Sequence, residues 1–188
     1  MGVMPWFAAL VVLTTASAAL AEATTADLDE LEQKPSGYWA LTFSGGAAFP
    51  LDDYADTHDE ALAAGVVVAY TGTSGLGIGI HAGYSPLPVL DEAVDGESTD
   101  NHVVHAALAP RFTLGKQTLR LFVGAGGGVL FEQAAARRTA AAALAQAGLE
   151  LHILGSGGLT VGGSYVRTFA KSAEAQLATA HAGFVMTF

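Results

Sequence analysis

The strongest constraint in this sequence is an alternation of apolar residues with small or polar ones, repeated along eight segments. Successive side chains of a β-strand point to opposite faces, so a period of two predicts strands. Each segment is close to the ~9–11 residues that a tilted strand needs to cross a bilayer. The eight segments are residues 38–49, 61–71, 75–85, 102–113, 118–131, 140–153, 159–169 and 177–188.

The two faces of most segments differ in character. In residues 75–85, Ile78, Ile80 and Tyr84 share one face, whereas glycine, histidine and serine occupy the other. Residues 177–188 alternate in the same way and end on an aromatic residue. The run Val66-Val67-Val68 leaves the faces of its segment unassigned.

The connections alternate between short and long. Three of them, residues 72–74, 114–117 and 154–158, have the length of tight turns. The other four are longer or more polar: residues 50–60, 86–101, 132–139 and 170–176. Short turns at one end and longer loops at the other predict an up-and-down antiparallel meander, which eight strands can close without leaving an edge.

The composition of the less apolar face decides which side of such a barrel meets lipid. A soluble barrel, the alternative, would expose a face rich in charged residues, yet only 14% of this chain is charged. The face carries mostly glycine, serine, threonine, alanine and histidine, which fit a narrow interior. We therefore predict an all-β, closed eight-stranded transmembrane β-barrel, with short periplasmic turns, longer extracellular loops and an apolar exterior.

The amino-terminal part differs from the rest. Residues 6–20 form an apolar stretch that ends at the small-x-small triplet Ala19-Leu20-Ala21. This pattern predicts a cleaved signal peptide over residues 1–21, a polar periplasmic lead over 22–37 and the barrel over 38–188. A retained membrane anchor is the alternative interpretation of the apolar stretch, although it is short for a span.

Two stretches resemble small bacterial outer-membrane barrels. Residues 181–188 resemble the carboxy-terminal signal of that class, which has a polar residue, a glycine, an apolar or aromatic residue and a final aromatic residue at fixed spacing. His181, Gly183, Met186 and Phe188 occupy these positions in order. Residues 120–128, RLFVGAGGG, are similar to a strand of the opacity, X-type and A-type group of eight-stranded proteins. The resemblance implies location in the outer membrane, insertion by the barrel-assembly machinery and a monomeric barrel.

Charged residues on the inner face predict an ion cluster in the lumen. A two-residue turn that begins at Gly115 would pair Thr113 with Thr118 and Arg111 with Arg120. Two opposed cations inside a barrel need an anion, and Glu150 on the following strand is the candidate. We expect Arg111, Arg120 and Glu150 to plug the lumen; a gated path for protons or ions is the alternative.

Histidines and glycines on the inner face suggest no catalytic site. The inward histidines are His81, His105, His152 and His181. They lie on four different predicted strands, so hydrogen-bonding fillers are expected and a zinc or copper site is the alternative. The glycine run 124–128 lies within a strand and lacks a following lysine, so it is no phosphate loop. No metal or cofactor is predicted.

The predicted loops carry an uneven charge. Residues 50–60 and 86–101 hold ten of the eighteen acidic residues. The later loops and the adjoining strand end hold four basic residues: Arg137, Arg138, Arg167 and Lys171. A solvated rim explains this pattern. The alternative is that the basic side contacts lipopolysaccharide phosphates while the acidic side takes divalent cations or a basic partner.

The functional prediction is a structural or surface-interaction role, in which a lipid-anchored barrel displays loops and supports the envelope. The net charge of −10 argues against a nucleic-acid partner. A narrow gated channel is the second hypothesis, and an outer-leaflet lipid enzyme is the third. Lipid A deacylases among small barrels carry a His-x-Ser pair, and none of the four inward histidines is followed by serine at that spacing. We therefore predict no enzyme.

Overall fold

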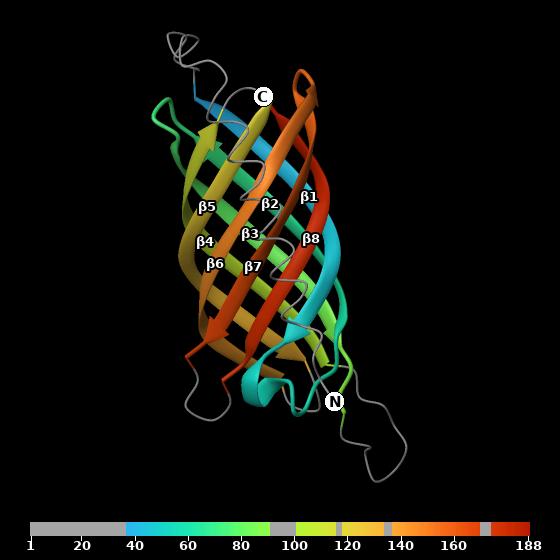
Figure 1. Ribbon diagram of the computed structural model, residues 1–188. Coiled ribbons are helices and arrows are strands. Elements are labelled where there is room, and N and C mark those ends of the chain that lie inside the picture. The colour runs from blue at the N-terminus through green and yellow to red at the C-terminus, as the bar shows by residue number, and fades with distance from the viewer. Residues whose placement is uncertain (1–36, 91–100, 116–117, 134–136, 170–173) are drawn as a thin grey trace. The chain divides into compact units, whose positions relative to one another are not determined.

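The computed structural model describes residues 37–90, 101–115, 118–133, 137–169 and 174–188. These residues form eight antiparallel strands and one short 3-10 helix, η2 (Asp52–Tyr54) (Figure 1). The predicted leader and nearly all of the predicted lead lie outside the described residues. The strands are β1 (Tyr38–Pro50), β2 (Ala61–Thr71), β3 (Leu76–Leu87), β4 (Asn101–Gly115), β5 (Leu119–Gln133), β6 (Arg137–Leu154), β7 (Gly157–Thr168) and β8 (Gln176–Thr187).

The strands pair in sequence order, and β8 pairs with β1 to close the barrel. At the seam, Trp39 and Phe188 exchange two backbone hydrogen bonds of 2.9 and 3.0 Å, so the final residue is held like any other strand residue. When cross-strand partners are followed once around the barrel from Leu41, the path returns to β1 at Leu51, ten residues further along the chain. This stagger tilts the strands against the barrel axis. The predicted fold class is confirmed.

The apolar face points outward. Large apolar side chains that are exposed on the barrel wall include Leu62, Leu76, Ile78, Ile80, Leu108, Ile153, Val161 and Phe184. Trp39 and Phe49 lie on the outer face of β1, ten residues apart. At ~3.3 Å per residue and a strand tilt of ~40°, the two residues are separated by roughly 25 Å along the barrel axis. This distance matches the apolar band of a membrane barrel.

No helix among the described residues is long enough and apolar enough to cross a bilayer. The faces of β2 are also settled, because Val68 and Tyr70 are exposed whereas Ala69 and Thr71 are buried. The even-numbered residues of this strand therefore face outward, and the run of three valines contributes Val67 to the lumen.

One predicted long loop is wrong. Residues 132–139 were expected to connect two strands, but β5 continues to Gln133 and β6 begins at Arg137, and these two residues are cross-strand partners. Polar side chains do not end a strand that has risen above the lipid, because both faces meet water there. The stretch also contains no glycine or proline that would interrupt pairing.

The predicted register of the β4–β5 hairpin is wrong as well. Thr113 pairs with Phe122 and Arg111 pairs with Gly124, whereas Gly115, at a φ of +115°, pairs with Arg120. The loop is therefore longer than a two-residue turn. The pairing differs from the predicted one by an even number of residues, so every side chain keeps its face. Arg111 and Arg120 both remain inside the barrel but do not oppose each other.

Glycines in the middle of β5 allow a close approach of strands. A Cβ atom added at Gly126 would collide with the carbonyl of Leu108, and one at Gly128 would collide with the carbonyl of Ala106. Both glycines face the lumen, where the curvature of the sheet brings the backbone of β4 too close to leave room for a side chain. These residues have a steric role in the wall.

Candidate functional site in the barrel lumen

A buried ion pair lies inside the lumen near the short-turn end and joins β4 to β6. The guanidinium of Arg111 on β4 donates to the carboxylate of Glu150 on β6, and the two side chains are only 2% and 1% exposed. Arg111 Nε also donates to Thr113 Oγ1 at 3.3 Å, and the guanidinium lies 4.2 Å from the ring centroid of Phe122. Hydrogen bonds and an aromatic face together replace the water that the cation loses.

The second arginine extends this cluster toward the short-turn end. Arg120 is the cross-strand partner of Glu150, but its guanidinium lies 4.2 Å from the ring centroid of Tyr38 and its Nη1 lies 3.4 Å from His152 Nε2. His152 Nε2 is also 3.4 Å from Glu150 Oε2. The three residues of the predicted ion cluster therefore lie together, and His152 joins them as a fourth member.

A cavity of about 60 Å³ adjoins the ion pair, and both polar and apolar side chains line it. Three of the four predicted lumen histidines line it, namely His81, His105 and His181, whereas His152 does not. His81 Nε2 is 2.9 Å from Gln146 Nε2, and the hydroxyls of Ser164 and Thr179 are 2.7 Å apart. The volume is large enough for a few water molecules, and the histidine, glutamine and hydroxyl groups offer them hydrogen-bond partners.

The histidines are not arranged as metal ligands. Within the described residues, no group of three or more histidine, aspartate or glutamate side chains converges closely enough to hold a metal ion. His81 is instead hydrogen-bonded to Gln146, and His105 and His181 pack over glycines of neighbouring strands. His81 therefore has a hydrogen-bonding partner in the lumen, whereas His105 and His181 fill space over the glycines.

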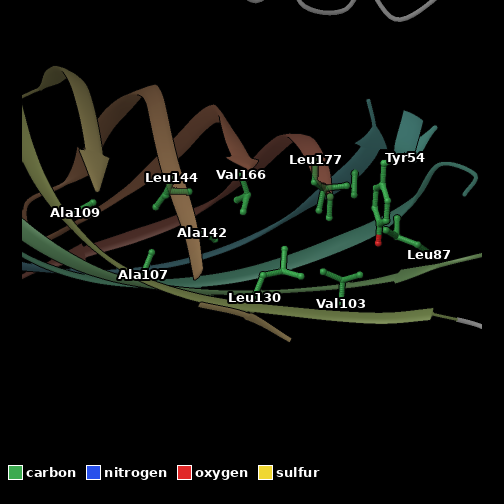
Figure 2. Packing of buried hydrophobic residues seen from close by; sticks show 12 residues of the cluster. Tyr54, Leu87, Val103, Ala107, Ala109, Leu130, Ala142, Leu144, Val166 and Leu177 are labelled. Atoms are coloured by element: carbon green, nitrogen blue, oxygen red, sulfur yellow. The ribbon is translucent and has the colours of Figure 1, made fainter. Parts of the chain in front are cut away.

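Above the cavity, apolar side chains fill the lumen. Figure 2 shows Val103 and Leu130 pointing toward Val166 and Leu177 from the opposite wall, with Leu87 beside Tyr54. All of these side chains are buried. The sequence pattern assigned small and polar residues to the whole inner face and so missed this apolar layer. Runs of consecutive apolar residues such as Val129-Leu130-Phe131 indicate this layer, because they place apolar side chains on both faces of a strand.

A segment between β1 and β2 covers the apolar layer. The phenol of Tyr54, in η2, donates to Glu132 Oε1 at 2.8 Å, and Asn101 Nδ2 donates to the same phenol at 3.2 Å. The His58 ring stacks on Tyr54 with centroids 4.1 Å apart, and its Nε2 lies 3.0 Å from Asn101 Nδ2. We call residues 51–60 the lid, because they close the barrel at the end opposite the short turns.

Burial sets the protonation of the lid. Burial raises the pKa of the Tyr54 phenol well above its usual range, and the neighbouring charge of Glu132 adds to this, so the hydroxyl stays a donor. Burial also lowers the pKa of the His58 imidazole. The neutral ring can accept a hydrogen bond from Asn101, which a protonated ring could not do.

The basic residues of the predicted rim fall into different environments. Arg137 and Arg138 lie in β6 and face opposite sides of the wall: Arg137 points outward, and Arg138 is the cross-strand partner of the inward Glu132. Arg167 Nη2 donates to Glu174 Oε2 at 2.6 Å on the exposed surface. Lys171 lies outside the described residues.

The residues of the predicted assembly signal lie on β8 and immediately after it. His181 and Gly183 face the lumen, whereas Met186 and Phe188 are exposed on the outer wall. Phe188 stands beside Trp39 at the seam. The two outward residues thus belong to the apolar exterior at the short-turn end.

A closed, antiparallel eight-stranded barrel with an apolar outer wall defines a small transmembrane β-barrel. No family model matches the sequence, and no curated protein matches it. Solved structures do match. Neisserial surface protein A aligns with a TM-score of 0.64 and 11% identity, covering 82% of this chain and 100% of that one.

Two proteins of Pseudomonas aeruginosa are also similar. The outer membrane protein OprG aligns with a TM-score of 0.59 and 11% identity over 81% of this chain and 96% of that one. The N-terminal β-barrel domain of OprF aligns with a TM-score of 0.55 and 14% identity over 83% and 100%. The chain therefore has the fold of the small eight-stranded outer-membrane barrels, as the sequence resemblance implied.

Proposed function

We propose that this protein is a non-conducting barrel of the outer membrane that anchors surface-exposed loops and stabilises the envelope, after export through a cleaved signal peptide and insertion by the assembly machinery. One observation carries the proposal: side chains fill the lumen at two separate levels. The Arg111–Glu150 pair blocks it near the short turns, and the apolar layer under the lid blocks it at the other end. Eight-stranded interiors are narrow enough to be filled in this way.

Planar-bilayer recording tests this proposal. The wild-type barrel should give no conductance steps, because an ion would have to cross both the apolar layer and a buried ion pair. A triple variant, Tyr54→Ala, Leu130→Ala and Glu150→Ala, weakens both closures and should conduct, with heat-modifiable gel migration as the check that it is folded. Discrete steps from the folded wild-type protein would contradict the proposal.

A narrow gated channel is the second candidate, and the cavity lined by three histidines supports it. Ordered water beside His81, His105 and His181 could pass protons if the lid opened. Wild-type conductance that rises when the lid alone is weakened, in Tyr54→Ala, would favour this function over the sealed barrel. The Glu132→Gln variant offers a milder weakening of the same contact.

The proposal includes no catalytic activity. It is supported by the missing His-x-Ser pair and by the bonding of the inward His81 to Gln146 in the lumen. Lipid A mass spectrometry, on cells with and without the protein, checks this point. A change in acyl chain number or length that depends on the protein would indicate an outer-leaflet lipid enzyme.

A further inference from the structure

The outer wall of β3–β6 changes character abruptly near its extracellular end. Cross-strand partners form rows around the barrel, and one row consists of Tyr84, Val104, Phe131 and Thr139. Its first three side chains are 42%, 41% and 44% exposed, although they are apolar or aromatic. Aromatic side chains of this kind mark the boundary between hydrocarbon and headgroups.

The next row outward is polar. It consists of Pro86, His102, Gln133 and Arg137, each the cross-strand partner of the next. We call the last three the outer polar row. Directly opposed side chains on one face lie about 5 Å apart at Cβ, so the three can contact a single small group. Each residue of this row lies two positions nearer the loop end of its own strand than its neighbour in the aromatic row, so the row lies closer to the lipid headgroups.

The chemistry of the outer polar row suits a phosphate. Arg137 offers a guanidinium that can bind two phosphate oxygens, and Gln133 offers an amide. Tyr84 Oη is 2.8 Å from His102 Nδ1 on the exposed wall. When the phenol donates to Nδ1, the imidazole proton lies on Nε2, which points away from Tyr84 and becomes a third donor.

The other basic residues of this rim are less suited to the same ligand. Arg138 lies on the inner side of the wall, where it is paired in register with Glu132. Arg167 already donates to Glu174. Of the arginines described at this end, Arg137 alone combines an outward direction with donors that follow in the same row on the next two strands, Gln133 on β5 and His102 on β4.

We propose that His102, Gln133 and Arg137 form a phosphate-binding site on the outer wall, and that its ligand is the phosphorylated headgroup of an outer-leaflet glycolipid whose acyl chains lie against Tyr84 and Phe131. The inference rests on the proposed outer-membrane location and adds a lipid partner to it. The lipid holds the wall of β3–β6 at a defined depth, with Tyr84 acting as the positioning residue for His102.

Native mass spectrometry of the detergent-solubilised barrel tests the site, with bisphosphorylated lipid A as the titrated probe. Arg137→Gln should weaken lipid A binding about tenfold, since one charge-assisted contact is lost. Arg138→Gln is the matched control, because it removes the same charge from the neighbouring position on the other face. Equal effects of the two variants would overturn the proposal.

Further arms separate phosphate recognition from acyl contact. Dephosphorylated lipid A should bind the wild type at least as weakly as lipid A binds Arg137→Gln, because it lacks the contacts to all three donors; undiminished binding would overturn the site. Inorganic phosphate at the lipid concentration should not displace lipid A, because it lacks the contacts to the aromatic row. Displacement at that concentration would overturn a lipid as the ligand.

A double-mutant cycle tests the part assigned to Tyr84. Tyr84→Phe should weaken lipid A binding several-fold in the wild type and have no effect in a His102→Phe background. A merely apolar role of Tyr84 would give the same loss in both backgrounds and would refute the positioning. Heat-modifiable gel migration confirms that each variant is folded. If the wild-type protein gives no conductance and also binds no lipid A, the phosphate site is refuted while the proposal of a non-conducting barrel stands.

Discussion

Replacement of Glu150 by alanine should strongly destabilise the barrel. The carboxylate is the acceptor for Arg111, and the two side chains are 1% and 2% exposed, so solvent cannot screen the charge that remains. Loss of one partner of such a buried pair costs ~3–5 kcal/mol of unfolding free energy. Loss of an ordinary hydrogen bond would cost only about 0.5–1.5 kcal/mol.

The size of this loss of unfolding free energy depends on the contacts that Arg111 would retain. After the substitution its guanidinium would retain the Thr113 hydroxyl and the Phe122 ring, and neither of these carries a negative charge. His152, which lies near the removed carboxylate, would lose its anionic neighbour as well. Glu150→Gln keeps an acceptor oxygen, so its cost should be smaller than that of Glu150→Ala.

Urea unfolding in lipid vesicles measures these free energies. Trp39 is the only tryptophan outside residues 1–21, and it lies half-exposed on the outer wall, so in a protein that begins after residue 21 its fluorescence reports transfer from lipid to water. The double variant Arg111→Met with Glu150→Leu should be close to the wild type, because neither charge is then buried alone. A cost under about 1 kcal/mol for Glu150→Ala, or a double variant as unstable as the two single variants summed, would refute the reasoning.

Two further predictions concern the other closure of the lumen. The unfolded His58 imidazole titrates near 6.5 and the folded one lower, so its contribution to lid stability is complete above pH 6.5 and decreases as the pH falls below that value. Hydrogen exchange of residues 51–60, corrected for intrinsic rates, should therefore accelerate on acidification in the wild type but not in His58→Gln; equal acceleration in both would contradict this. Leu130→Ala should cost ~2–5 kcal/mol by leaving a cavity in the apolar layer, and clearly more than the lipid-facing control Leu108→Ala; equal costs in urea unfolding would contradict the packing.

Much of the fold could be predicted because local alternation and global architecture agree. In a strand, the face of a side chain depends only on whether its position is odd or even, so Ile78, Ile80 and Tyr84 were assigned to the exterior without knowledge of any partner strand. Parity also explains why the error at the β4–β5 hairpin left Arg111 and Arg120 inside the barrel. A register error by an even number of residues changes partners but not faces.

The lumen was harder to predict, because its contacts join strands that are distant in sequence. Arg111 and Glu150 were expected together, but the stacking of Arg120 on Tyr38 brings together residues from β5 and β1, which no local pattern relates. The same holds for Tyr54, whose polar and acidic neighbours suggested an exposed loop. Its burial depends on Glu132 and Asn101, which two other strands place at the barrel mouth.

The sequence by itself determined the period, the number of strands and the side that faces lipid, since each of these follows from the order of apolar and small residues along single segments. Only the tertiary structure decided what occupies the middle of the barrel. Strand stagger sets which inward side chains share a level, and that stagger is a property of the closed sheet. The apolar layer, the cavity with three histidines and the outer polar row all arise from it.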